Sequence, residues 1–133
     1  MTTTTPANPS TATPPSARAT LARYGERLAE RYLREHGFTV LARNWRCRAG
    51  EVDIVALDGD CLVVCEVKTR RGTTFGSPVE AVTVAKLARL RRLAAAWLAQ
   101  QDTHVGDVRI DVIGILRPRR GVCTVEHLVG VGA

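Results

Sequence analysis

The segment GEVDIVALDGDCLVVCEVKTR, residues 50–70, decides the fold of this chain. Two runs of alternating aliphatic residues lie on either side of an Asp58-Gly59 turn signal, a pattern typical of an antiparallel β-hairpin. Charged residues interrupt the valines at four positions: Glu51, Asp53, Glu66 and Lys68. The hairpin therefore carries three carboxylates and an ammonium in a region where a small protein is expected to keep its core.

The expected register brings these charges together. If Asp58 and Gly59 are the two loop residues, Glu51 faces Glu66. Opposed residues point to the same side of a sheet and alternate residues share a face, so all four charged side chains project from one face, with Asp53 diagonal to Glu66. The opposite face is expected to be apolar: Val52, Ile54, Val63, Cys65 and Val67.

A bound cation would explain this arrangement. Directly opposed carboxylates at Glu51 and Glu66 would destabilise a purely structural hairpin, and a cation between them would remove that cost. A few oxygen ligands with room for water suit Mg²⁺ or Mn²⁺ better than zinc. The ammonium of Lys68 could then hold an attacking water or neutralise charge on a phosphate. The alternative is that these charges occupy the solvated face of an ordinary antiparallel sheet.

Residues from about Thr20 to His36 are predicted to form the first helix. Gly25 lies near the centre of its apolar face, where a glycine lets a helix approach a sheet closely. Glu26 falls on the border of that face. Gly37 is expected to end the helix in a left-handed conformation.

A second helix is predicted after the hairpin. Its expected start is a capping box with Ser77 as N-cap, Pro78 at the first helical position and Glu80 two residues further, and it runs to about Gln101. Further strands are predicted at residues 38–45, 107–116 and, more weakly, 121–128. The order α-β-β-β-α-β-β predicts an α/β sandwich, with a mixed β-sheet flanked by helices.

Composition bounds the class of protein. The 133 residues suit one domain at residues 20–133, preceded by a Thr/Pro/Ala-rich leader at residues 1–19 that is expected to be disordered. A net charge of +6 and a pI near 9.8 favour an anionic partner, nucleic acid first. No apolar run approaches the about 18 residues that span a bilayer, so no membrane partner is expected. The four cysteines form no CxxC pair and are expected to be reduced, which favours a cytoplasmic location.

Several polar and aromatic residues have structural interpretations beside functional ones. Trp45 is a candidate for stacking on a base or, alternatively, a partly buried anchor. Trp97 belongs to the core or to a subunit interface. Arg109 and Asp111 share a strand face and are expected to pair with each other.

The spacing from Asp53 to Glu66-Val67-Lys68, after a helix bearing Glu26, resembles the PD-(D/E)xK nuclease core. This core defines the restriction-endonuclease-like superfamily, which includes the archaeal Holliday-junction resolvases. More closely, the chain resembles the YraN family of small bacterial proteins over about residues 20–116. The motifs that carry this resemblance are GE (25–26), RNWR (43–46), GEVDIVA (50–56), VVCEVKTR (63–70), FGSPVEAV (75–82), Lys86 and RIDVI (109–113).

The resemblance implies a role for each matching residue. Asp53 and Glu66 correspond to the metal-binding acids, and Lys68 corresponds to the lysine that assists the attacking water. Glu26 is placed like the helix glutamate that resolvase-like members add to the metal site. Glu51 matches the GE motif of the YraN family and is a further candidate without an assigned role. Val52 stands where the superfamily motif has its proline.

The resemblance therefore implies a restriction-endonuclease-like fold and a Mg²⁺- or Mn²⁺-dependent DNA endonuclease, with branched or recombination DNA as a candidate substrate. Junction-cutting relatives act as dimers, which makes a homodimer a candidate assembly. The expected nucleic-acid contacts are Arg70, Arg71, Lys86 and Arg89, with Arg92 on the same basic helix stripe. One alternative is a non-catalytic nucleic-acid-binding or adaptor module that keeps the fold. Another is a protein-interaction domain whose charge serves solubility.

Overall fold

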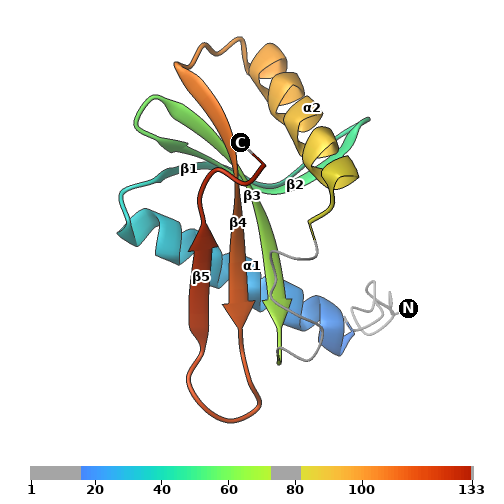
Figure 1. The fold of residues 1–133 in the computed structure, drawn as a ribbon, viewed down its shortest axis with the longest axis vertical. Helices are drawn as coiled ribbons and strands as arrows, with labels where there is room; N and C mark the ends of the chain where they lie inside the picture. The colour runs from blue at the N-terminus through green and yellow to red at the C-terminus, as the bar shows by residue number, and fades with distance from the viewer. Residues whose placement is uncertain (1–15, 73–81, 133) are drawn as a thin grey trace, which may run out of the picture.

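The computed structural model describes residues 16–72 and 82–132. It consists of a five-stranded sheet and two helices, in the predicted order (Figure 1). The elements are α1 (Ala17–Glu35), β1 (Thr39–Cys47), β2 (Gly50–Asp58), β3 (Cys61–Arg70), α2 (Val84–Gln101), β4 (Asp107–Leu116) and β5 (Thr124–Leu128). The strands lie in the order β1-β2-β3-β4-β5. Only β3 and β4 are parallel, so the predicted α/β sandwich with a mixed sheet is confirmed.

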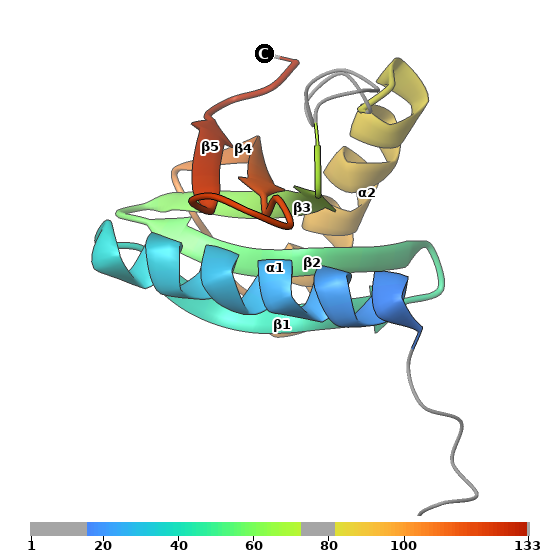
Figure 2. The same ribbon diagram turned by 90° about the horizontal axis from the view of Figure 1, so that it is seen from below.

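The two helices cover opposite faces of the sheet, and Figure 2 shows α1 lying in front of β1 and β2 and running roughly alongside them. The α1 core is formed by Ala29 and Leu33 of the helix with strand residues such as Val63. The α2 core lies on the other face, where Leu93 packs near Val64. Because neighbouring residues of β3 serve different cores, both faces of the hairpin are buried over most of its length. The charged face considered above is therefore limited to the open end of the hairpin, away from the turn.

Gly25 brings α1 into direct contact with β3. A Cβ atom built on Gly25 would lie 1.7 Å from Oγ1 of Thr69, so any larger residue would force the helix away from the strand. This close approach was predicted and is confirmed. The helix begins at Ala17, three residues before its expected start, because the side chain of Ser16 caps it by accepting a hydrogen bond from Ala19 N–H. Gly37 follows the helix end with a φ of 86°, as expected.

The hairpin register differs from the prediction by two residues. Asp58 pairs with Cys61, so the loop consists of Gly59 and Asp60 rather than Asp58 and Gly59. An Asp-Gly signal marks a turn without fixing which two residues form it. A shift of two does not by itself change the face of any side chain, because side-chain direction repeats every second residue.

The same shift removes the expected opposition of Glu51 and Glu66. The β2–β3 ladder ends at the pair Ile54–Cys65, and Glu51 pairs instead with Arg46 of β1. Their side chains form an ion pair, with Arg46 Nε 3.1 Å from a carboxylate oxygen of Glu51. The predicted like-charge contact was therefore wrong, and Glu51 has an exposed partner of opposite charge.

Strand β2 changes faces beside Asp53. Val52 packs in the α2 core and Ile54 in the α1 core, although alternate residues of a regular strand share a face. On β1, Asn44 has a left-handed φ of 51° just before Trp45, which pairs with Val52. The expected common face of Val52 and Ile54 was wrong because this irregular position turns both strands.

Helix α2 begins at Val84, and its N-cap is Thr83, whose Oγ1 accepts a hydrogen bond from the N–H of Lys86 at 3.1 Å. Val82, expected inside the helix, precedes this cap. The predicted capping box of Ser77, Pro78 and Glu80 lies outside the described residues. The predicted strand 107–116 matches β4, and the predicted strand 121–128 is shortened to Thr124–Leu128.

The aromatic and cysteine residues have structural roles. Trp45 packs edge-on against Trp97, with ring centroids 5.4 Å apart. Trp45 is therefore a partly buried anchor, and Trp97 is a core residue. All four cysteines are free, as expected, and Cys65 is fully buried. Among the described residues, no helix combines the length and apolarity needed to cross a bilayer.

Candidate functional site

The candidate site lies where β2 and β3 part. Beyond the pair Ile54–Cys65 the main-chain ladder stops, and Oδ2 of Asp53 accepts a hydrogen bond from the N–H of Val67 at 2.8 Å. The carboxylate of Asp53 thus replaces a main-chain carbonyl of β2 as the acceptor for β3. This bond holds Asp53 beside Glu66, the residue before Val67.

Asp53 is in an electrostatic environment unusual for a carboxylate. Burial raises its pKa from 3.8 to about 7, and the negative charges of Glu66 and Glu26 act in the same direction. The hydrogen bond from Val67 and the positive charge of Lys68 act in the opposite direction but do not offset these effects. A half-buried carboxylate beside two other acids would gain from a nearby cation.

Glu66 is shared by two lysines. Its side chain is almost buried, and Oε1 lies 3.2 Å from Nζ of Lys68 and within ion-pair distance of Nζ of Lys86. Burial, reinforced by the neighbouring Lys86, lowers the pKa of Lys68. For Lys86, burial acts to lower the pKa, but the hydrogen bond and charge of Glu66 outweigh it and the pKa is raised. Glu66 and Lys68 were expected to share a face and are in contact, whereas the contact of Glu66 with Lys86 was not predicted.

Glu26 reaches the site from α1. The close contact of Gly25 with Thr69 sets this part of the helix over the end of β3. Glu26 lines a pocket of about 500 Å³ together with Lys68 and Thr69. Its carboxylate charge contributes to the raised pKa of Asp53. Glu26 therefore lies close to Lys68 and Asp53, in the position predicted for it.

Asp53 and Glu66 are the candidate ligands for a metal ion. Within residues 16–72 and 82–132, no group of three or more Asp, Glu, His or Cys side chains is arranged to hold one. Asp53 and Glu66 lie near enough for the charge of Glu66 to raise the pKa of Asp53, and Glu26 contributes negative charge to the same group. Carboxylate oxygens completed by water suit Mg²⁺ or Mn²⁺, so the donor chemistry fits the expected ion.

The expected nucleic-acid contacts are distributed over two elements. Arg70 and Arg71 line the same pocket as Lys68, and Arg18 of α1 lines it from the other side. Nε of Arg70 is buried and has no hydrogen-bond partner among the described residues. On α2, Arg89 is exposed, and Lys86 is engaged by Glu66.

Glu51 is not brought to the site. Its side chain is 56% exposed and pairs with Arg46 on β1, whereas Glu66 lies on β3 beyond the end of the ladder. Nothing in the geometry gives Glu51 a role beside Asp53.

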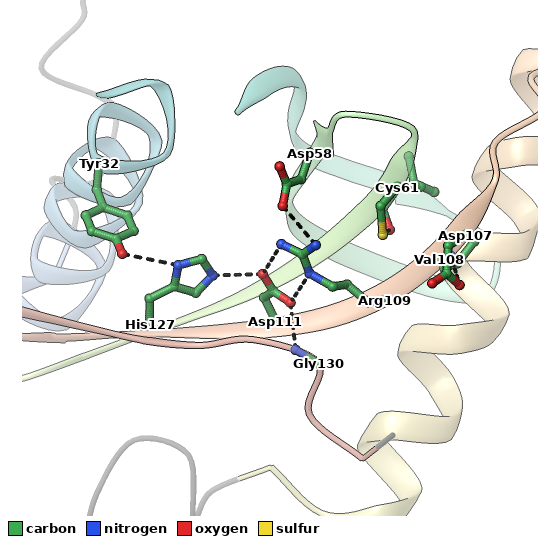
Figure 3. Close-up of polar contacts among 10 residues, drawn as sticks. Tyr32, Asp58, Cys61, Asp107, Val108, Arg109, Asp111, His127 and Gly130 are labelled. Atoms are coloured by element: carbon green, nitrogen blue, oxygen red, sulfur yellow. Dashed lines mark hydrogen bonds and ion pairs between the residues drawn. The ribbon is translucent and has the colours of Figure 1, made fainter. Parts of the chain in front are cut away.

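A second polar cluster lies on β4 and β5 and is shown in Figure 3. Asp111 is fully buried and accepts hydrogen bonds from Arg109 Nε at 3.0 Å, from His127 Nε2 at 2.7 Å and from the main-chain N–H of Gly130 at 3.0 Å. Burial opposes ionisation of Asp111, but the hydrogen bonds from His127 and Arg109 prevail and lower its pKa. Tyr32 of α1 contacts the other ring nitrogen of His127 at 3.2 Å.

The pairing of Arg109 with Asp111 was predicted and is confirmed. The participation of His127 was missed, because its position beside Asp111 depends on the register of β5 against β4. The cluster ties the C-terminal segment and α1 to the central strands, and Arg109 also reaches Asp58 at the hairpin.

A family model described as "Uncharacterised protein family UPF0102" matches residues 25–115, which include Glu26, Asp53, Glu66, Lys68 and Lys86. The chain belongs to the UPF0102 family. This is the YraN-type family, so the resemblance drawn from the motifs is confirmed. UPF0102 proteins of Beutenbergia cavernae and Streptomyces griseus are each 58% identical to this chain, matching 87% of it and 98% of their own length. A UPF0102 protein of Nocardioides is 56% identical over 84% of the chain and 90% of its own length.

Proposed function

We propose that this UPF0102 protein is a metal-dependent endonuclease that hydrolyses phosphodiester bonds in DNA, with Asp53, Glu66 and Lys68 at the reacting centre. One observation carries the proposal. Asp53 is fixed by Val67 N–H at the point where the hairpin opens, and its pKa is raised to about 7 by burial and neighbouring acids. A perturbed acid pair beside a lysine in a basic pocket favours a reactive site over a solvated strand face.

The proposed chemistry divides the work among these residues. The oxygens of Asp53 and Glu66 would hold Mg²⁺ or Mn²⁺, which supplies Lewis-acid polarisation of the phosphodiester when bound. Lys68 extends from β3, as Glu66 does, and would place positive charge where the phosphate gains negative charge during attack. The lowered pKa of Lys68, caused by burial and by Lys86, makes its amine better suited to exchange a proton with the attacking water at neutral pH.

The DNA would enter along the pocket of Lys68. Arg70 and Arg71 supply positive charge in the pocket that Lys68 and Glu26 also line, where a phosphate oxygen could accept from their guanidinium groups. A net charge of +6 adds longer-range attraction. Branched or recombination DNA is the substrate that the PD-(D/E)xK resemblance favours, and the same resemblance favours a homodimer. Four free cysteines agree with a cytoplasmic location.

The second candidate function is a DNA-binding module without catalysis. The observation that favours it is the neutralisation of Glu66 by Lys68 and Lys86, which stabilises the site without a metal. Such a module would bind DNA through the same arginines and leave it uncut.

A cleavage screen tests the proposal. Labelled duplex, single-stranded and four-way branched DNA are incubated with Mg²⁺ or Mn²⁺ and with wild type, Asp53→Asn, Glu66→Gln or Lys68→Met protein. We expect cleavage by wild type and loss of about 100-fold or more in rate for each variant. Glu51→Gln is the matched control, because it removes a carboxylate of the same hairpin outside the site, and it should cut normally.

The controls separate the two functions. Equal cleavage by wild type and the three site variants would identify a contaminating nuclease and refute the proposal. Salt-sensitive binding to DNA with no product on any substrate would establish the binding module instead.

A further inference from the structure

Both lysines of this chain contact one carboxylate. The protein has 19 basic Lys and Arg residues, of which only Lys68 and Lys86 are lysine. Their Nζ atoms share Oε1 of Glu66, although Lys68 lies on β3 and Lys86 on α2. Lysine carries a compact ammonium on a flexible stem, and arginine carries a broad planar guanidinium. The two compact, flexible ammonium groups of the chain therefore both contact Oε1 of Glu66.

Helix stability does not explain Lys86. With Thr83 as N-cap, Lys86 is the third residue of α2, and Thr83 Oγ1 caps its N–H. This position favours acidic side chains, because the amino end of a helix carries partial positive charge. The first turn of α2 contains no acidic residue. Glu66 supplies the negative charge that makes a lysine favourable there.

Lys86 also contacts the carboxylate that would have to bind a divalent cation. A buried carboxylate needs a partner of opposite charge, and Lys86 provides one for Glu66. An ion held by Glu66 and Asp53 would lie a few ångströms from that ammonium and would be repelled by it. Lys86 can leave, because its side chain is 21% exposed and reaches Glu66 from a separate helix. Lys68 lies on the same strand as Glu66 and is held beside it.

We propose that Lys86 is a built-in counter-ion that neutralises Glu66 in the metal-free protein and is displaced when a divalent cation binds. This inference rests on the proposed function, since it concerns the same metal site. It assigns opposite effects to the groups around Glu66: the carboxylates favour metal binding, and the ammonium of Lys86 competes with it.

Calorimetric titration of EDTA-treated protein with Mn²⁺ tests the competition without DNA. We expect Lys86→Gln to bind Mn²⁺ about tenfold more tightly than wild type, because the competing charge is gone. Lys86→Arg keeps the charge and should not tighten binding. Arg92→Gln removes an exposed charge from the same helix without touching Glu66, and should change the affinity by about twofold at most because salt screens it.

A labelling experiment on the wild-type protein gives a second readout that does not depend on a variant folding. An amine-reactive reagent followed by mass spectrometry should modify Lys86 severalfold faster in Mn²⁺ than in EDTA, with a smaller change at Lys68. Since the chain has no other lysine, the two sites are read separately.

The outcomes distinguish this inference from the function on which it rests. Mn²⁺ affinity that is equal or weaker in Lys86→Gln, with wild type binding normally, overturns the counter-ion role and leaves the nuclease proposal standing. The absence of Mn²⁺ binding in every protein, Lys86→Gln included, overturns both. Binding that becomes measurable only in Lys86→Gln supports the competition between Lys86 and the ion but overturns its displacement in wild type.

Discussion

Oδ2 of Asp53 accepts a hydrogen bond from the main-chain N–H of Val67 at 2.8 Å. This bond continues the pairing of β2 with β3 for one further step after the main-chain ladder has ended at Ile54 and Cys65. A side chain that completes a sheet is fixed more firmly than one that extends into solvent. The position of the acid is therefore coupled to the strand that carries Glu66 and Lys68.

Asp53 makes the metal-free protein less stable as pH rises. Its folded-state pKa of about 7 lies above the ordinary value of 3.8, so the folded protein binds this proton more tightly than the unfolded chain. The contribution of Asp53 to the free energy of unfolding is therefore full below pH 3.8 and is lost as pH rises to about 7. Asp53→Asn, whose amide oxygen can still accept from Val67, should be roughly 3 kcal/mol more stable than wild type at pH 8.

Urea denaturation in EDTA at pH 8 and pH 4 measures this effect. The gain should disappear at the lower pH, where wild-type Asp53 is protonated. A variant no more stable than wild type at pH 8 would show that Asp53 is not under electrostatic stress. Saturating Mg²⁺ should reduce the difference at pH 8, because it stabilises only the ionised carboxylate.

Gly25→Ala should destabilise the protein despite the better helix propensity of alanine. Alanine favours an exposed helix by about 1 kcal/mol, but here its Cβ would overlap Oγ1 of Thr69. We expect a net loss of about 1–3 kcal/mol in thermal or urea denaturation. The double variant Gly25→Ala/Thr69→Ala should recover part of the loss, and no recovery would place the strain elsewhere.

Asp111→Asn should cost about 3–5 kcal/mol at pH 7, because it leaves Arg109 without its buried partner. The pKa of Asp111 is lowered in the folded protein, so its stabilisation is present above pH 3.8 and is lost as pH falls further. The difference between variant and wild type should shrink in that acidic range.

Asp58→Asn is the matched control for the Asp111 variant. It also removes a carboxylate from Arg109, but this side chain is 47% exposed and should contribute at most about 1 kcal/mol. Equal losses from the two variants would contradict the importance of burial at Asp111.

DNA binding should depend on the arginines beside the site. Arg70→Gln and Arg71→Gln should each reduce the slope of log affinity against log salt by about 0.9, if each contacts one phosphate. Fluorescence anisotropy with duplex DNA over a range of NaCl concentrations measures the slope. Arg31→Gln on α1, whose side chain is 71% exposed and pairs with Glu35, should leave it unchanged, and equal effects at all three positions would indicate general charge attraction.

The features predicted from sequence are those that repeat locally. Strand β4 was predicted with its observed bounds because its aliphatic alternation is long. The role of Gly25 was predictable because a glycine within an apolar helix face usually marks a close approach to a neighbouring element. Asp53 and Glu66 came together even though the loop was misplaced, because an error of two residues preserves side-chain direction.

The features that were missed depend on where separate elements meet. Glu51 was placed opposite Glu66 because the hairpin was extended past Ile54, where the two strands actually part. Lys86 reaches Glu66 only through the packing of α2 on the sheet, and His127 reaches Asp111 only through the register of β5. No local pattern contains this information, since each contact joins residues distant in sequence.

The parallel pairing of β3 with β4 has a kinetic consequence. It joins Cys61 to Asp107 across the whole of α2, whereas β1, β2 and β3 form a meander of short connections. Local pairings form early and distant ones late, so we expect the meander to assemble first. During that interval Asp53 and Glu66 would approach each other before α2 delivers Lys86, and dissolved divalent ions would then accelerate refolding.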